Sequence, residues 1–310
     1  MSSAQTMHTV ESGYAVITPA HNEAAHLAET IRSVLAQTTL PQLWLIVDDG
    51  STDQTACVVE QYAQHQQWIC LLRRKRDPAE TYFGSNVHAI MDGWRLIHKE
   101  PFDFLAILDA DITLPSNYYA EILARFDCNP KLGIASGVYE NLIGDRLVRH
   151  LNDRRSTPKA IQVFRRACFE QICGYLPLAH GGEDVCACVM AQMRGWKTWS
   201  YPDLKAIHRR PTGTGGSAGA LRASYQEGIR EYHLATHPLF MVVKSLRRCC
   251  LEPPLVLGGV VRLLGYVRCY LRREPRKLAP AIVRYIRREQ LLRLVCFNRI
   301  PQDKKVMLKR

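Results

Sequence analysis

The chain has 310 residues, of which 47% are hydrophobic and 23% are charged, and its formal net charge is +12. This length and composition are typical of a globular protein with one large or two small domains, and they exclude a disordered or fibrous chain. No apolar run approaches the roughly 20 residues that span a bilayer, and residues 1–12 lack the apolar centre of a signal peptide, so we expect a cytoplasmic protein.

Residues 13–112 alternate between short apolar runs and helical patterns. The runs are rich in branched side chains and end at polar turns, which predicts strands, and the segments between them carry apolar residues at helical spacing. The expected strands are residues 14–19, 43–47, 69–72 and 104–108, and the expected helices are residues 23–37, 53–66 and 86–99. This order builds βαβ units, so we expect an α/β fold with a mostly parallel central sheet covered by helices on both faces.

Polar clusters follow three of these expected strands. They are Pro19-Ala20-His21-Asn22-Glu23, Asp48-Asp49 and Asp109-Ala110-Asp111. Ligands of parallel sheets bind beyond the carboxyl ends of the strands, so the clusters indicate a site at that edge. Asp109 and Asp111 repel each other unless a positive charge lies between them, and hard divalent cations favour such oxygen ligands. The alternative for this pair alone is an acidic loop after a core strand.

Two common nucleotide-binding motifs are absent from the sequence. The first expected strand is not followed by GxGxxG, which disfavours hydride transfer with a nicotinamide cofactor, and no GxxxxGK[ST] motif indicates a P-loop NTPase. The phosphates of a bound nucleotide would therefore be neutralised by a metal ion at the two aspartates and by basic side chains.

The second half of the body continues with strands and helices up to a glycine-rich segment. The expected strands are residues 134–139, 159–165 and 197–201, and the expected helices are residues 116–128, 167–173 and 185–194. Gly181-Gly182-Glu183-Asp184 precedes the last of these helices. His208-Arg209-Arg210 precedes the glycines at 213–219, and one imidazole with two guanidinium groups suits a diphosphate. The glycines predict either a lid that orders over a ligand or a flexible linker.

Taken in order, these motifs resemble those of glycosyltransferase family 2, whose members have the GT-A fold and are inverting nucleotide-sugar transferases. The resemblance covers residues 14–210 and is carried by Pro19 with Asn22-Glu23, by Asp48-Asp49-Gly50-Ser51-Thr52-Asp53, by Asp109-Ala110-Asp111 and by Gly182-Glu183-Asp184. The segments 232–240 and 287–290 resemble the tail of bacterial members associated with extracellular polysaccharide assembly. The chain departs from a common family pattern at Gly84-Ser85.

The resemblance implies a donor site at the strand ends. Contacts with the nucleotide sugar are expected from Thr18, Pro19, Ala20, Glu23, Asp48, Asp49, Asp109, Ala110 and Arg209. A carboxylate of the Asp48-Asp49 pair can accept the imide N–H of uracil, which favours UDP over GDP, and the alternative for this pair is a helix N-cap. Mg²⁺ or Mn²⁺ is expected on Asp109 and Asp111, where it would bridge the diphosphate and offset charge on the leaving group.

The same resemblance implies a catalytic pair and a third metal ligand. Asp184 is expected to act as the general base that takes the proton of the acceptor hydroxyl, and Glu183 to orient Asp184 or the acceptor. The alternative is that two acids at a helix N-terminus are stabilised by the helix dipole. His208 is a candidate third ligand of the metal ion, and the alternative is a structural histidine.

The basic charge of the protein lies in its C-terminal part. Residues 241–310 contain 18 Lys/Arg and 4 Asp/Glu, a balance of +14, whereas the other 240 residues contain 23 and 25, a balance of −2. From residue 221 onward the pattern is helical. The apolar segment 253–267, flanked by arginines, suits an interfacial helix on an anionic membrane, and a helix packed on a core is the equal alternative. A nucleic-acid role is disfavoured because no recognition motif accompanies the charge.

The eleven cysteines are odd in number and scattered. No CxxC pair is present, and Cys186-Ala187-Cys188 has no second pair at the spacing of a zinc site. This pattern predicts reduced thiols in a cytosolic protein and disfavours metal binding by cysteine.

These observations predict a GT-A domain at residues 13–212, with a nucleotide-binding half at 13–112 and an acceptor half at 113–212, and a basic helical extension at 213–310. The expected activity is an inverting, metal-dependent transfer of a sugar from a nucleotide-diphosphate sugar to a saccharide or lipid-linked acceptor, in cell-surface or extracellular polysaccharide synthesis. Two alternatives stay open: a sugar-1-phosphate nucleotidyltransferase, whose glycine- and lysine/arginine-rich loop is absent here, and a catalytically silent sugar-nucleotide-binding protein.

Overall fold

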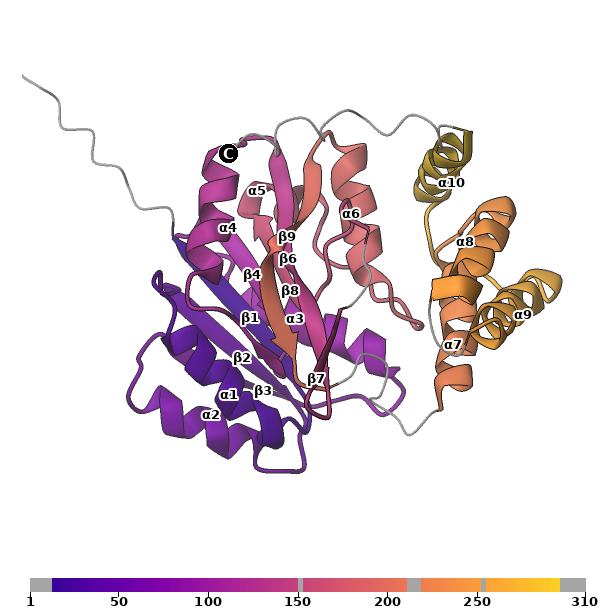
Figure 1. Cartoon of the computed structure of the whole chain (residues 1–310). Coiled ribbons are helices and arrows are strands. Elements are labelled where there is room, and N and C mark those ends of the chain that lie inside the picture. Colours follow the sequence, from indigo (N-terminus) through magenta and orange to yellow (C-terminus); the bar gives the residue numbers. More distant parts are fainter. Residues whose placement is uncertain (1–12, 150–152, 211–218, 252–254, 296–310) are drawn as a thin grey trace, which may run out of the picture. The chain divides into compact units, whose positions relative to one another are not determined.

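A computed structural model describes residues 13–149, 153–210, 219–251 and 255–295 (Figure 1). The chain forms two compact units: residues 1–179 with 183–212, and residues 180–182 with 213–310. The expectations for residues 1–12, for most of the glycine-rich segment and for Pro253-Pro254 lie outside the described residues.

Within the described part of the chain, the first unit is built around a mixed sheet of nine strands in the order β3-β2-β1-β4-β8-β6-β9-β5, with β7 paired to β6. The strands are β1 (Tyr14–Ala20), β2 (Leu43–Asp49), β3 (Ile69–Arg74), β4 (Phe104–Leu108), β5 (Ile112–Thr113), β6 (Leu132–Ile143), β7 (Arg146–Arg149), β8 (Ile161–Arg165) and β9 (Lys197–His208). The ladders joining β3, β2, β1 and β4 are parallel, as expected for the nucleotide-binding half. Beyond β4 the sheet turns antiparallel at β8, and β6 with β9 forms the remaining parallel ladder.

Helices of the described residues cover this sheet: α1 (Ala24–Leu35), α2 (Thr55–Ala63), α3 (Tyr82–Ile97), α4 (Tyr118–Asp127), α5 (Arg166–Gln171) and α6 (Glu183–Met193). The apolar faces of α1, α2 and α4 bury Leu27, Val59 and Tyr118 against one side of the parallel strands. On the other side, Gly93 of α3 lies where an added Cβ would be 3.1 Å from Val47 and 3.2 Å from Ile17. Strands β1, β2 and β4 are therefore buried on both faces, which explains their apolar sequences.

Two element boundaries differ from the sequence expectation in ways that affect the site. The helix expected at residues 86–99 begins at Tyr82, because Thr81 caps it by accepting the N–H of Gly84 at 3.2 Å. The strand expected at residues 43–47 continues through Asp48 and Asp49, which pair with Arg73 and Arg74 of β3. Both aspartates therefore belong to the end of a strand and not to the following turn.

In its described residues, the second unit contains four helices: α7 (Ala220–His233), α8 (Pro238–Leu251), α9 (Leu257–Leu271) and α10 (Pro280–Val295). Helices α7 and α9 cross closely at glycines, since a Cβ on Gly228 would lie 1.9 Å from the carbonyl oxygen of Arg262 and one on Gly265 would lie 2.3 Å from that of Tyr225. Their shared core contains Ile229, Tyr232, Met241, Tyr266 and Cys269. None of the described helices is both long and apolar enough to cross a membrane.

A buried carboxylate and two polar side chains of α10 join the helices of this unit. Glu231 is 4% exposed and is paired with Lys244 of α8. Burial opposes its ionisation, but Lys244 outweighs burial and lowers the pKa of Glu231 to about 2. Arg287 and Gln290 of α10 bond to the segment after α7, where Gln290 Oε1 accepts the N–H of His237 at 2.7 Å. The Arg287-Arg288-Glu289-Gln290 motif thus has a packing role.

Candidate active site

The carboxyl ends of β1, β2 and β4 lie at one edge of the sheet, because these strands are parallel neighbours. Ala20 of β1 is the register partner of Asp48 in β2. The turn after β1 is also tied to the turn after β2, since Asn22, with a φ of 56°, accepts a hydrogen bond from the N–H of Thr52 at 2.8 Å. The three polar clusters of the sequence therefore share one edge.

The two aspartates at the end of β2 have different surroundings. Both oxygens of Asp49 are engaged, by the guanidinium of Arg74 and by the hydroxyl of Ser85. Among the described residues, the side chain of Asp48 has one hydrogen bond, in which its Oδ1 accepts the N–H of Ser51 at 3.0 Å. Asp49 therefore joins β2 to β3 and α3, whereas Asp48 keeps an oxygen that can accept the N–H of a base.

Asp109, directly after β4, lies against a buried lysine. Lys159 Nζ is 2.6 Å from Asp109 Oδ1 and 2.9 Å from Asn86 Oδ1. Burial disfavours the charged amine, but the negative charges of Asp109 and Glu183 outweigh it and raise the pKa of Lys159 above its ordinary value. The amine therefore stays charged and neutralises Asp109.

Asp111 is 3% exposed and lies between two basic side chains. Its Oδ1 is 3.2 Å from His208 Nε2, and its Oδ2 is 3.2 Å from Arg210 Nη2. The short strand β5 creates this arrangement, because Ile112 is the register partner of His208 in β9. Burial opposes ionisation, but the hydrogen bond and charge of His208 and the charge of Arg210 hold the pKa of Asp111 below its ordinary value. The carboxylate is therefore ionised.

The other ring nitrogen of His208, Nδ1, is 3.1 Å from the side-chain oxygen of Asn141. When Nδ1 donates to this oxygen, the facing Nε2 of His208 and the Asp111 oxygen can share a proton or can both bind a metal ion. Metal-bound histidines commonly donate their other N–H in this way. The donor set of Asp111 and His208 therefore fits a divalent cation.

Asp109 is held apart from that pair. Within the described part of the chain, the ligand atoms of Asp109, Asp111 and His208 do not gather within 4.8 Å of one another, and Asp109 is paired with Lys159. A cation shared by all three residues would have to displace the lysine from Asp109. The three expected ligands thus lie in one region without converging on one point.

Glu23 adds a third carboxyl group to this region. Arg210 Nη2 is 2.5 Å from Glu23 Oε1, while Oε2 is buried without a hydrogen bond from the described residues. Burial and the charge of Asp111 raise the pKa of Glu23 to about 7, although Arg210 opposes the shift. An unsatisfied buried oxygen is costly, and a bound cation or a ligand hydroxyl would satisfy it.

We expect Glu23→Gln to flatten the pH dependence of stability. The pKa of Glu23 rises from 4.5 to about 7 on folding, so the folded state binds this proton more tightly than the unfolded state. The stabilisation that protonated Glu23 gives the folded state is therefore lost as pH rises from about 4.5 to about 7, and the free energy of unfolding falls by up to about 3 kcal/mol. Urea unfolding of both proteins at pH 5 and pH 8 measures the difference. Glu121→Gln, at a more exposed acid of α4, is the control, and equal pH slopes for Glu23→Gln and the unmodified protein contradict the expectation.

The two acids that open α6 also differ in environment. They follow Gly181 and Gly182, whose φ angles of 79° and 94° are adopted without strain only by glycine. Glu183 is 4% exposed, its Oε2 is buried without a hydrogen bond from the described residues, and burial followed by the charge of Asp184 raises the pKa of Glu183 well above its ordinary value. Asp184 is half-buried, and its Oδ1 accepts the N–H of Val185. Asp184 is therefore the more accessible acid.

The family model of Glycosyl transferase family 2 matches residues 15–178, which is more than half of the chain. The chain belongs to glycosyl transferase family 2. The matched region includes Asp48, Asp109, Asp111 and Lys159, whereas Asp184 and His208 lie beyond it. The family resemblance inferred from the sequence motifs is confirmed, and the chain is a glycosyltransferase.

A curated family 2 relative is the poly-beta-1,6-N-acetyl-D-glucosamine synthase of Staphylococcus epidermidis, which is 25% identical over 131 residues. The match covers 42% of this chain and 29% of the synthase. The chain therefore corresponds to less than a third of that relative's length.

Several solved glycosyltransferases share the fold. Mannosyltransferase PcManGT from Pyrobaculum calidifontis, in complex with GDP-Man and Mn²⁺, has a TM-score of 0.56 and 17% identity, covering 92% of this chain and 81% of that one. S. aureus TarS 1-349, in complex with UDP-GlcNAc, has a TM-score of 0.52 and 13% identity, covering 84% and 73%. GalNAc-T7, with UDP, GalNAc and Mn²⁺, has a TM-score of 0.56 and 14% identity, covering 94% and 58%. The GT-A fold expected for a family 2 member is confirmed.

Other residues expected to contact the donor in this family 2 chain are held by the core. The hydroxyl of Thr18 accepts the indole N–H of Trp44 at 2.9 Å, and the carbonyl of Ala110 accepts the hydroxyl of Thr30 at 2.7 Å. Pro19 and Ala20 complete β1 and are buried. These residues build the floor of the site edge, and direct contact between them and a donor stays a prediction.

The two adjacent arginines point to different partners. Arg209 pairs with Glu29, and its Nε donates to Thr113 Oγ1 at 2.8 Å. Arg210 instead contacts Glu23 and Asp111. Arg209 is the donor contact expected from the family resemblance, whereas Arg210 is the arginine that contacts the acidic cluster.

Lys159 contacts the candidate site through Asp109. From the sequence, it is expected only as the first residue of a strand. A charged residue just before an apolar strand is the sole local signal, and it is weak, because lysines are common at strand ends. Ser85 was named only as a departure from the family pattern, and it donates to Asp49. Both positions depend on pairings between distant strands and helices, which a single sequence does not specify.

Proposed function

We propose that this enzyme transfers a sugar from a nucleotide-diphosphate sugar to a saccharide or lipid-linked acceptor, with inversion at the anomeric carbon, in the synthesis of cell-surface or extracellular polysaccharide. The observation that carries the proposal is the placement of Asp109, Asp111 and His208 beside Lys159 and Arg210 at one end of the GT-A sheet. Carboxylates and an imidazole suit a divalent cation, and an amine and a guanidinium suit phosphate oxygens.

The proposed donor is a UDP-sugar. Asp48 keeps one oxygen free of hydrogen bonds from described residues, and the imide N–H of uracil is a donor of matching chemistry. Two of the similar proteins support this choice, TarS by its complex with UDP-GlcNAc and GalNAc-T7 by its complex with UDP. Because the similar mannosyltransferase is in complex with GDP-Man, GDP-sugars are the first donors to compare with UDP-sugars in an activity assay.

The proposed cofactor is Mg²⁺ or Mn²⁺, held by Asp111 and His208 with Asp109. The ring nitrogen of His208 that faces Asp111 and the unsatisfied buried oxygen of Glu23 support a cation here, and two of the similar structures contain Mn²⁺. Such an ion supplies a Lewis acid for the diphosphate oxygens. Lys159 and Arg210 would add charge-assisted hydrogen bonds to the phosphates once the donor draws them from the carboxylates.

Asp184 is the proposed general base, and Glu183 is the proposed positioning acid. The acceptor hydroxyl must lose its proton as its oxygen bonds to the anomeric carbon, and the proton passes to the Asp184 carboxylate. Asp184 is accessible and opens a helix, whereas Glu183 is buried and more readily protonated. Attack opposite the leaving diphosphate in a single step gives the inverted product.

Incubation with a panel of UDP- and GDP-sugars tests the activity. Metal-dependent release of nucleoside diphosphate, increased by a saccharide or lipid-linked acceptor, is the expected result. A nucleotidyltransferase would instead release pyrophosphate from a nucleoside triphosphate and a sugar 1-phosphate. Tight binding of a sugar nucleotide without release of product would identify a silent binding protein.

The second unit provides a surface for the membrane contact that we propose at the cytoplasmic face. Exposed apolar residues recur at helical spacing on two of its helices, Leu239, Val242, Val243 and Leu246 on α8, and Leu257, Val260, Leu264, Val267 and Leu271 on α9. Exposed arginines such as Arg247, Arg268 and Arg272 belong to the same helices or follow them directly. An apolar stripe with basic neighbours suits anionic lipid.

Replacing Leu264 and Leu271 with serine is expected to weaken binding to vesicles containing anionic lipid at least tenfold, about 1.4 kcal/mol, because each leucine would leave the bilayer interface. Their exposed fractions are 57% and 75%, so the helix core stays unchanged. Cosedimentation measures the binding. Leu96→Ser, at a leucine of α3 that is 59% exposed, is the matched control, and equal binding by the double variant and this control contradicts a membrane role for the stripe.

A further inference from the structure

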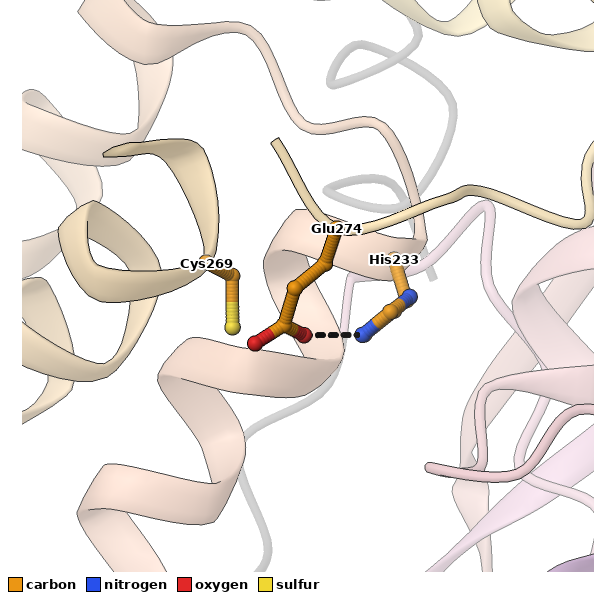
Figure 2. Close-up of side chains that lie close together, drawn as sticks. All are labelled: His233, Cys269 and Glu274. Atoms are coloured by element: carbon orange, nitrogen blue, oxygen red, sulfur yellow. Dashed lines mark ion pairs between the residues drawn. The ribbon is translucent and has the colours of Figure 1, made fainter. Parts of the chain in front are cut away.

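Three potential metal ligands meet in the second unit, outside the motifs found at residues 14–210. They are His233 at the end of α7, Cys269 in α9 and Glu274 just after α9 (Figure 2). One ligand atom from each, a ring nitrogen, the sulfur and a carboxylate oxygen, lies within 4.8 Å of the others. His233 is distant in sequence from Cys269 and Glu274, and the group contains a single cysteine, so no cysteine spacing in the sequence indicates it.

Backbone hydrogen bonds hold these three positions together. The N–H of Glu274 donates to the carbonyl of Cys269 at 3.2 Å, and the hydroxyl of Tyr232 donates to the carbonyl of Glu274 at 2.9 Å. Tyr232 adjoins His233 in α7, so this bond ties the turn after α9 to α7. The close crossing of α7 and α9 at Gly228 restricts their separation further. The ligand positions are therefore set by packed backbone.

The contacts within the cluster leave it incompletely satisfied. His233 Nε2 is 3.3 Å from Glu274 Oε2, yet this nitrogen is buried and lacks a well-aligned hydrogen bond among the described residues. Cys269 is fully buried, and its thiol lies beside the same carboxylate. A buried polar nitrogen without a hydrogen bond costs free energy, which a ligand at this point would recover.

We propose that His233, Cys269 and Glu274 bind a Zn²⁺ ion. The mixed set of nitrogen, sulfur and oxygen donors suits this borderline-soft cation better than Mg²⁺, which prefers oxygen ligands. Tetrahedral zinc with bonds of about 2.0–2.3 Å separates its ligand atoms by roughly 3.3–3.7 Å, so small rotations of side chains within 4.8 Å of one another suffice. A water molecule completes the four ligands.

The charges of such a site balance. Zinc binds the thiolate, so the thiol proton leaves to solvent, and thiolate and carboxylate together cancel the two positive charges of the ion. This neutrality matters because Arg276 lies nearby, with its guanidinium 3.9 Å from the ring of Tyr232 and its Nε donating to the Tyr232 carbonyl. An uncompensated cation would be repelled by this arginine.

The ion would act as a staple between α7, α9 and the following turn. The ring of His180 stacks on that of His233 at 4.3 Å, and His180 lies three residues before Glu183 in the sequence. Fixing the ring of His233 in place would therefore also fix the ring on which His180 stacks. The site is independent of the proposed donor chemistry.

Titration of the full-length protein with Co²⁺, as a spectroscopic substitute for zinc, tests the proposal. A thiolate bound to Co²⁺ gives a charge-transfer band in the near ultraviolet. The acidic cluster around Asp111 contains no cysteine, and loss of the band in Cys269→Ser distinguishes this site from the other cysteines of the chain. We expect the band in the unmodified protein, in Cys249→Ser and in Asp111→Asn, and its loss in Cys269→Ser. Zinc affinity should fall at least about 100-fold in Cys269→Ser, since even loss of an outer-shell partner costs 10–100-fold.

Circular dichroism and thermal unfolding establish that each variant is folded, and Glu274→Gln serves as a second ligand variant if Cys269→Ser unfolds. Zinc should raise the melting temperature of the unmodified protein more than that of Glu274→Gln. No cobalt band, or equal zinc binding by the unmodified protein and a folded ligand variant, overturns the proposal and leaves a His233–Glu274 ion pair beside a buried thiol.

Discussion

Asp111→Asn is expected to lower the Mn²⁺-dependent affinity for the donor nucleotide at least 100-fold, about 2.7 kcal/mol, while the protein stays folded. Asp111 is buried beside His208 and Arg210, and its ionised carboxylate supplies the negative charge that a cation needs. Asparagine keeps the shape of the side chain but carries no charge. Arg210 retains its contact with Glu23, so the loss of stability stays smaller than the loss of metal binding.

Calorimetric titration with UDP in the presence and absence of Mn²⁺ measures this effect. Asp203→Asn is the matched control, because Asp203 is an exposed acid of the same unit that pairs with Arg125 at the surface. The control should bind like the unmodified protein. An unchanged gain from Mn²⁺ in Asp111→Asn would place the metal ion elsewhere.

Asp184→Asn is expected to lower kcat by about 10²–10⁴, the usual contribution of a positioned general base. Asparagine preserves the size of the side chain and its acceptor for the N–H of Val185. It cannot take the proton of the acceptor hydroxyl. Donor affinity should change less than tenfold, about 1.4 kcal/mol, because the acid is proposed to act on the acceptor.

Glu183→Gln separates the two acids of α6. Glu183 is buried and its carboxyl group is more readily protonated, so an amide resembles it more closely. We therefore expect Glu183→Gln to lower kcat less than Asp184→Asn does. Steady-state kinetics of both variants, and nuclear magnetic resonance of the anomeric product, provide the measurements. A near-normal rate in Asp184→Asn, or a product with retained configuration, rules out the proposed mechanism.

Much of the fold could be predicted because burial leaves a local trace. β4 was predicted with its observed bounds, since all five residues are apolar and buried and the run ends abruptly at Asp109. β7 was missed because residues 146–149 are short and partly charged, and their pairing with β6 forms around the turn at Gly144. Parallel pairing of the first strands followed from the helices between them, whereas the antiparallel placement of β8 left no local pattern.

The candidate site divides in the same way. Carboxylates at strand ends can be recognised in the sequence, because Asp48 and Asp109 directly follow apolar runs that predict buried strands. Their counterions are not visible. Lys159 reaches Asp109 because β8 pairs antiparallel with β4, where Leu108 is the register partner of Ile161. Arg74 reaches Asp49 because the two are register partners across β3 and β2. Register is a tertiary property that a residue pattern constrains only weakly.

The pairing of Lys159 with Asp109 and of Arg210 with Asp111 leaves these four side chains without net charge before any ligand arrives. A nucleotide-diphosphate sugar carries two negative charges on its diphosphate, and a divalent cation brings two positive ones, so the pair is also neutral. Two neutral partners attract each other little beyond a Debye length, which is about 8 Å at physiological ionic strength. Capture of the metal-bound donor should therefore depend weakly on salt, and its rate should reflect how quickly the local ion pairs exchange and not long-range steering.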